Sequence, residues 1–98
     1  MPFYYELPTP DLGGSADEPI KLVRWLAEPR DWLEAGTPVA IVELAGLDYE
    51  VLANGTAIMG EWLLAPGEAV HSGEPMAVLY ADGECIPYGR PYSLARRA

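Results

Sequence analysis

The chain has 98 residues, which fits one domain, because domains cluster at about 100–150 residues. Its formal net charge of −9 repels phosphate backbones and anionic lipid surfaces, so we expect no binding to nucleic acid or to a membrane. No apolar run approaches the ~20 residues that a membrane-spanning helix needs.

The cysteine content and the first residues favour a cytoplasmic protein. Cys85 is the only cysteine, so no disulfide can form within the chain. The opening residues lack the basic and then apolar layout of a signal peptide. Residues 1–80 hold 13 acidic and 3 basic side chains. A body of this charge suits a protein partner with a basic surface.

A strand is expected at residues 3–7, followed by a Gly-Gly-Ser loop, and two stretches then repeat at a constant offset of 37 residues. Residues 24–42 read RWLAEPRDWLEAGTPVAIV, and residues 61–79 read EWLLAPGEAVHSGEPMAVL. No gap is needed to superpose them. The identical pairs are Trp25 and Trp62, Leu26 and Leu63, Pro29 and Pro66, Gly36 and Gly73, Pro38 and Pro75, and Ala40 and Ala77.

Each repeat predicts a strand, a proline turn, a short strand, a glycine turn and an apolar strand. Proline biases the residue before it toward extended geometry, and Gly36 and Gly73 can adopt a positive φ. The short runs of valine, isoleucine and leucine between Gly and Pro favour strands over helices. The expected short strands are residues 32–33 and 69–70, and the expected apolar strands are residues 39–44 and 76–80.

Between the repeats, residues 44–48 are expected to form a tight hairpin. Its residues are Leu44, Ala45, Gly46, Leu47 and Asp48. An extended run follows at residues 49–52, and Ala53-Asn54-Gly55 signals a second turn. Each repeat alone would leave an apolar face in water, so we expect the two units to close over a shared core.

Residues 81–98 contain glycines and prolines and few apolar side chains after Ile86, which predicts a flexible C-terminal tail. A single β domain is therefore expected over residues 1–80. The stretch Pro-Tyr-Gly-Arg-Pro-Tyr at residues 87–92 allows a second interpretation. In this alternative the tail is an arm that docks on a partner or on a second copy of the chain.

Over about residues 6–80 these features resemble the biotinyl/lipoyl attachment domain family. The resemblance rests on WLAEPRDWLEAGTPVAIVE, on the Asn-Gly-Thr turn at residues 54–56, and on LAPGEAVHSGEPMAVL. It implies an all-β fold, a flattened barrel-sandwich hybrid of two small antiparallel sheets with internal quasi-two-fold symmetry. Arg30 departs from the pattern, because the family usually has a glycine there.

In that family the hairpin between the two units carries a lysine, to which a ligase joins biotin or lipoate through an amide bond. The family's spacing reaches Gly46 when counted forward from Gly36 and Leu44 when counted backward from Gly55, so this hairpin is shortened. No lysine lies in or beside it, and the chain's only lysine is Lys21. Because the amide requires an amine, we expect no biotin, no lipoate and no other cofactor on this chain.

The resemblance then implies a non-enzymatic interaction or accessory module. Its partner would be a component of a 2-oxo acid dehydrogenase or biotin-dependent carboxylase, a ligase or an assembly partner. The contact would involve the acidic surface and residues 44–48. Two alternatives remain: a structural companion of a true carrier domain, and a carrier whose acceptor lies outside the usual hairpin. An enzyme is not expected, since so small a core leaves little room for a catalytic pocket.

The remaining polar candidates each have a structural interpretation that we favour over a functional one. Lys21 is expected to be a solvated strand lysine. His71 has no second histidine or cysteine nearby in sequence, so we expect an exposed turn residue and no metal site. Glu43 and Glu50 flank the hairpin and could face each other across it, where a paired acid–base role is the alternative to two solvated carboxylates. Cys85 is expected to be a free thiol.

The three tryptophans are treated separately because large aromatic side chains often dominate protein contacts. Trp25 and Trp62 occupy equivalent positions in the two repeats and are expected to pack in the core or at an edge. An aromatic contact surface is the alternative. Trp32 has Ala69 as its counterpart, so an exposed Trp32 would be the first candidate for a contact residue that contributes strongly to binding.

Overall fold

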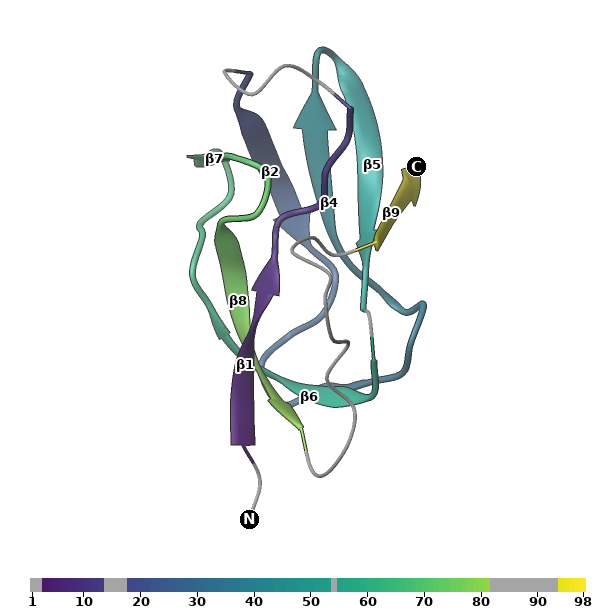
Figure 1. Ribbon diagram of the computed structural model, residues 1–98, viewed down its shortest axis with the longest axis vertical. Helices are drawn as coiled ribbons and strands as arrows, with labels where there is room; N and C mark the ends of the chain where they lie inside the picture. The colour runs from purple at the N-terminus through teal and green to yellow at the C-terminus, as the bar shows by residue number, and fades with distance from the viewer. Residues whose placement is uncertain (1–2, 14–17, 54, 82–93) are drawn as a thin grey trace.

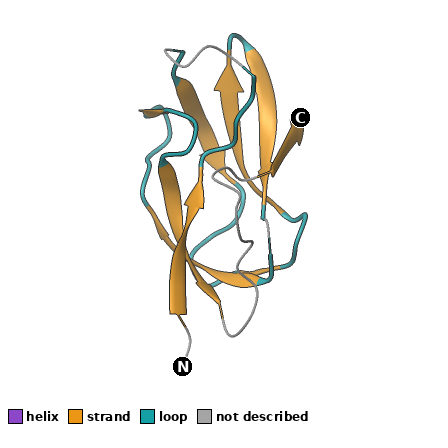
Figure 2. Cartoon of the chain, in the orientation of Figure 1, coloured by secondary structure: helices purple, strands orange, loops and turns teal. Residues whose placement is uncertain are grey.

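The computed structural model describes residues 3–13, 18–53, 55–81 and 94–98. In these residues the chain forms nine strands, and Figure 2 shows strands and loops there but no helix. The strands are β1 (Phe3–Pro8), β2 (Ile20–Trp25), β3 (Trp32–Leu33), β4 (Pro38–Leu44), β5 (Leu47–Leu52), β6 (Ala57–Trp62), β7 (Ala69–Val70), β8 (Pro75–Ala81) and β9 (Leu94–Arg97).

The strands pair into two antiparallel sheets, and neither sheet closes on itself. The four-stranded sheet has the order β1-β8-β6-β3, and the five-stranded sheet has the order β7-β2-β4-β5-β9. The two sheets lie toward opposite ends of the long axis (Figure 1). Each repeat places strands in both sheets, because β3 pairs with β6 and β7 pairs with β2. The short strands therefore join the repeats.

The prediction of an all-β chain is confirmed, and most strands lie where the sequence predicts them. The short strands β3 and β7 have the expected bounds, and β4 begins one residue earlier than expected. Gly36 and Gly73 have φ values of +88° and +87°, as their place in the repeat predicts. The predicted and observed strand bounds agree because the proline and glycine residues determine where strands can begin and end.

The end of the chain contains a strand that composition does not predict. Residues 82–93, which hold Cys85 and most of the expected tail, lie outside the described residues. After them, β9 pairs antiparallel with β5, from Tyr49 opposite Arg97 to Leu52 opposite Leu94. A strand of this length with two arginines has no clear strand period, so only the open edge of β5 explains its pairing.

The core lies between the sheets and is filled by aliphatic side chains from both of them. Strand β2 illustrates the pattern, because Ile20 and Leu22 are buried while Lys21 and Val23 are exposed, as alternation on a half-buried strand requires. The buried core residues are Leu7, Ile20, Leu22, Ala27, Leu33, Val39, Ala40, Val42, Leu44, Val51, Ala53, Ala57, Met59, Val70, Met76, Ala77 and Leu79.

The ends of β2 and β6 meet through a pair of stacked indoles. Trp25 and Trp62 have ring centroids 5.6 Å apart and an interplanar angle of 3°. The Trp25 Nε1–H donates to the Leu64 carbonyl at 2.9 Å, and the Trp62 Nε1–H donates to the Ala27 carbonyl at 3.0 Å. Each hydrogen bond is the counterpart of the other at the offset of 37. Each repeat therefore accepts an indole N–H from the other.

The proline turns also have matching contacts at this offset. The Glu28 amide donates to the Asp31 carboxylate at 2.8 Å, and the counterpart Ala65 amide donates to the Glu68 carboxylate at 2.6 Å. These side chains hold the two turns in the same conformation, and each turn contains one residue with a positive φ. In the second turn that residue is a glycine, while in the first it is Arg30.

Replacing Arg30 should therefore stabilise the protein. Arg30 has φ +79° and its counterpart Gly67 has φ +92°, a region that costs a residue with a Cβ about 1 kcal/mol. We predict that Arg30→Gly raises the free energy of unfolding by about 1 kcal/mol in urea denaturation, and that Gly67→Ala lowers it by a similar amount. A loss of stability in Arg30→Gly would contradict this explanation.

Candidate functional site

The hairpin between β4 and β5 is the site at which the resemblance places function. Strand β4 ends at Leu44 and β5 begins at Leu47, so Ala45 and Gly46 form a two-residue turn. Their φ values are +53° and +80°, the signs that a type I′ turn requires at both central positions. The prediction of a tight hairpin is confirmed. Its turn matches the right-handed twist of the two strands it joins.

The side chains of the hairpin include no amine, thiol or hydroxyl group. Leu44 is buried in the core, whereas Ala45, Gly46, Leu47 and Asp48 are exposed. An aliphatic side chain and a carboxylate are therefore the groups that the hairpin presents to a partner. Neither can accept an acyl group in an amide bond.

The two-residue turn also decides which side chains face each other. It places Glu43 opposite Asp48 and Ile41 opposite Glu50. The alternative in which Glu43 and Glu50 lie directly opposite each other is therefore excluded by the register, which the turn sets. Lys21 lies opposite Glu43 on the neighbouring strand and is exposed, as predicted.

Strand β9 covers the edge of the hairpin's second strand. The Arg96 Nε donates to the Glu50 carboxylate at 2.6 Å, and the Arg97 guanidinium carbon lies 5.9 Å from the centroid of the Tyr49 ring. At the end of the chain the Ala98 amide donates to the Asp48 carbonyl at 3.1 Å. Pairing therefore continues along β5 to the hairpin, where it reduces the open edge of the sheet.

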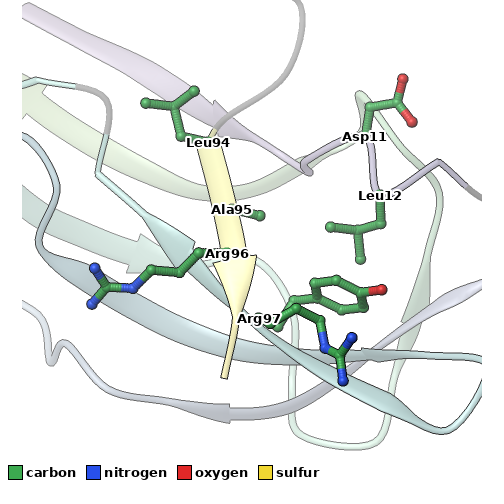
Figure 3. Close-up of a pocket in the computed structure, with 7 residues that line it drawn as sticks. Asp11, Leu12, Leu94, Ala95, Arg96 and Arg97 are labelled. Atoms are coloured by element: carbon green, nitrogen blue, oxygen red, sulfur yellow. The ribbon is translucent and has the colours of Figure 1, made fainter.

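An open cleft of about 470 Å³ lies beside β9. Figure 3 shows Arg96 and Arg97 pointing to opposite sides of the strand, with Leu12 on the side of Arg97. The cleft is lined by charged and apolar side chains, and the guanidinium of Arg96 is already paired with Glu50. The lining residues are Asp11, Leu12, Tyr49, Leu94, Ala95, Arg96 and Arg97.

His71 lies in the turn before β8 and is exposed, as predicted. Its backbone N–H donates to the Glu74 carboxylate at 2.7 Å, and its ring Nδ1 lies 3.0 Å from the same oxygen. The backbone hydrogen bond, and then the ring contact, hold the pKa of the Glu74 carboxyl below its ordinary value. Within the described residues no group of three histidine, cysteine or acidic side chains is placed to hold a metal ion.

Trp32 is the aromatic residue that distinguishes the first repeat from the second. It lies on β3 opposite Ile58, and 63% of its surface is exposed. Trp32 is therefore exposed, as a residue that contacts a partner would have to be. Trp25 and Trp62 stack on each other, and each donates its indole N–H to the opposite repeat, while 41% of the Trp62 surface remains exposed.

No protein-family model matches the chain, and no curated protein matches it. In the part of the chain that is described, no helix is long and apolar enough to span a bilayer.

The ion pair between Glu50 and Arg96 should stabilise β9 measurably. Its carboxylate is largely buried and its guanidinium is more exposed, so we expect a contribution of about 0.5 kcal/mol. We predict that Glu50→Gln speeds amide exchange in β9 about two- to threefold while β8 is unaffected. Glu61→Gln, on the other sheet, is the matched control. Unchanged exchange in Glu50→Gln would show that the ion pair contributes nothing.

Proposed function

We propose that this chain is a non-catalytic domain of the biotinyl/lipoyl type that is not itself modified and that serves as a protein-interaction or accessory module. In this proposal the two sheets form a flattened barrel-sandwich hybrid with quasi-two-fold symmetry. The module acts in the cytoplasm and carries no cofactor.

The pairing of the strands supports the proposed symmetry. If β2 is matched with β6, β3 with β7 and β4 with β8, the order β7-β2-β4-β5 has the counterpart β3-β6-β8-β1. Strands β5 and β1 then take equivalent places although they lie outside the repeated sequence, and β9 is added beyond β5. The reciprocal hydrogen bonds of Trp25 and Trp62 fit the same relation.

The hairpin without an amine is the observation that carries the functional proposal. Its turn, Ala45-Gly46, lies at the junction of the two repeats, where the family has its acceptor lysine. An exposed hairpin that lacks the acceptor can still be recognised by proteins that recognise carriers. Leu47 and Asp48 are the exposed side chains that such a partner would contact.

The class of partner follows from the same reasoning. A component of a 2-oxo acid dehydrogenase or of a biotin-dependent carboxylase binds loaded carriers, and a ligase binds unloaded ones. The net charge of −9 favours partners with a basic surface. Fold alone does not decide among these partners, so a direct test is required.

Co-expression with biotin and lipoate ligases tests the absence of modification. We predict that intact-mass analysis finds the unmodified chain only, because no amine lies at the hairpin apex. A true carrier domain expressed in the same cells is the positive control. A modified species would contradict the proposal, and the Lys21→Arg variant would then show whether Lys21 is the acceptor.

Affinity capture from cell extract tests the proposed partners. The tagged chain should recover dehydrogenase, carboxylase or ligase subunits, and the variant Leu47→Ala/Asp48→Ala should recover less of them. Recovery of a lysine-bearing carrier domain in place of these subunits would favour the alternative of a structural companion. If the hairpin variant and the original chain recover the same proteins in equal amounts, the hairpin is not the contact.

A further inference from the structure

Four side chains form an exposed row across the full width of the four-stranded sheet. Tyr4 lies opposite Tyr80, Tyr80 lies opposite Ile58, and Ile58 lies opposite Trp32. Directly paired residues project from the same face of a sheet, so these four are neighbours on one surface. Their exposed fractions are 71%, 43%, 40% and 63% in that order. We call this set the apolar row.

The second sheet shows that the fold does not require apolar residues at these positions. At the offset of 37, the counterparts of Tyr80, Ile58 and Trp32 are charged or small side chains. The corresponding row on the five-stranded sheet is Asp48, Glu43, Lys21 and Ala69, and its members pair in the same order. Exposed apolar side chains add an aggregation risk without helping the core, so they indicate contact with another molecule.

The apolar row is also held in place before any partner binds. The Tyr4 and Tyr80 rings pack edge to face, with centroids 6.4 Å apart and an interplanar angle of 69°. A Cβ on Gly60 would lie 2.6 Å from the Tyr80 ring and 2.6 Å from the Val78 carbonyl oxygen. The glycine therefore lets the Tyr80 ring lie close to β6. Rings ordered in this way lose little conformational entropy on binding.

The charges around the apolar row favour a cationic partner. Strands β1, β3, β6 and β8 contain two acidic residues, Glu6 and Glu61, and no basic residue. The exposed Arg30 precedes β3 and its amide donates to the Met59 carbonyl at 2.8 Å, but the acidic Asp31 follows it directly. Glu6 is exposed and lies two residues from Tyr4, so both project from the same face. Tyrosine and tryptophan rings attract arginine and lysine through cation–π contacts, and the carboxylates strengthen that preference. A second copy of the chain, with its own charge of −9, is disfavoured.

We propose that the apolar row binds an extended basic segment of a partner protein. Arginine or lysine side chains of that segment stack on Trp32 and Tyr4, and an apolar side chain contacts Ile58. This surface belongs to a different sheet from the β4–β5 hairpin, and the two lie toward opposite ends of the molecule in Figure 1. The proposal therefore does not rest on the hairpin or on the absence of a cofactor.

A labelled peptide of alternating arginine and leucine is the probe for this surface. In near-physiological salt, NMR titration should shift the amides of β1, β3, β6 and β8. The double variant Tyr4→Ala/Trp32→Ala leaves the net charge unchanged and should weaken binding about tenfold, since exposed aromatic anchors dominate such contacts. Val23→Ala, which shortens an exposed apolar side chain on β2 of the other sheet, is the control and should bind as the original chain does.

Several outcomes would overturn the proposal. They are no binding of the peptide, shifts centred on the five-stranded sheet, or equal affinity for the double variant after its folding has been verified by thermal denaturation. Dimerisation in sedimentation experiments that Trp32→Ala abolishes would identify a second copy as the occupant and would also overturn it. None of these results bears on the hairpin, so this proposal and the proposed function fail independently.

Discussion

The stacked indoles of Trp25 and Trp62 are the contact on which the relation between the two sheets depends. Each ring ends a strand of one sheet and packs flat on the ring from the other. Because each N–H donates to a carbonyl of the opposite repeat, neither indole is satisfied unless both repeats are in place. The backbone joins the repeats in the same way, because β3 of the first repeat pairs with β6 and β7 of the second repeat pairs with β2. Two short repeats that could not bury a core separately are in this way closed over a shared one.

The two sheets differ in the side chains that they expose at matching positions. Matching positions across the sheets hold Tyr80 and Glu43, Ile58 and Lys21, and Trp32 and Ala69. The shared fold explains what is common to the sheets, and it does not explain why one outer row is apolar and the other is charged. The hairpin at one end presents an aliphatic side chain and a carboxylate, whereas the apolar row on the other sheet presents aromatic rings.

The sequence predicts well where strands and turns lie along the chain, because proline and glycine determine local geometry whatever the tertiary context. Gly36 and Gly73 have the positive φ that the repeat requires, and the hairpin turns within residues 44–48. Register is less accessible, because composition does not distinguish a two-residue turn at residues 45–46 from one at residues 46–47, and the second would have placed Glu43 opposite Glu50. Strand β9 could not be predicted, since its pairing depends on the open edge of β5. The apolar row depends on pairs distant in sequence, and it is visible only when the register is known.

Exchange of the indole N–H protons tests the central claim most directly, because the chain contains three tryptophans in two different settings. In a proton-exchange experiment followed by NMR, the Nε1–H groups of Trp25 and Trp62 should both be protected, while that of the exposed Trp32 should exchange rapidly and serve as an internal reference. Protection of both indoles, with cross-peaks between the two rings, is the result expected if the repeats are joined reciprocally. Exchange of either Trp25 or Trp62 as fast as Trp32 would contradict the account.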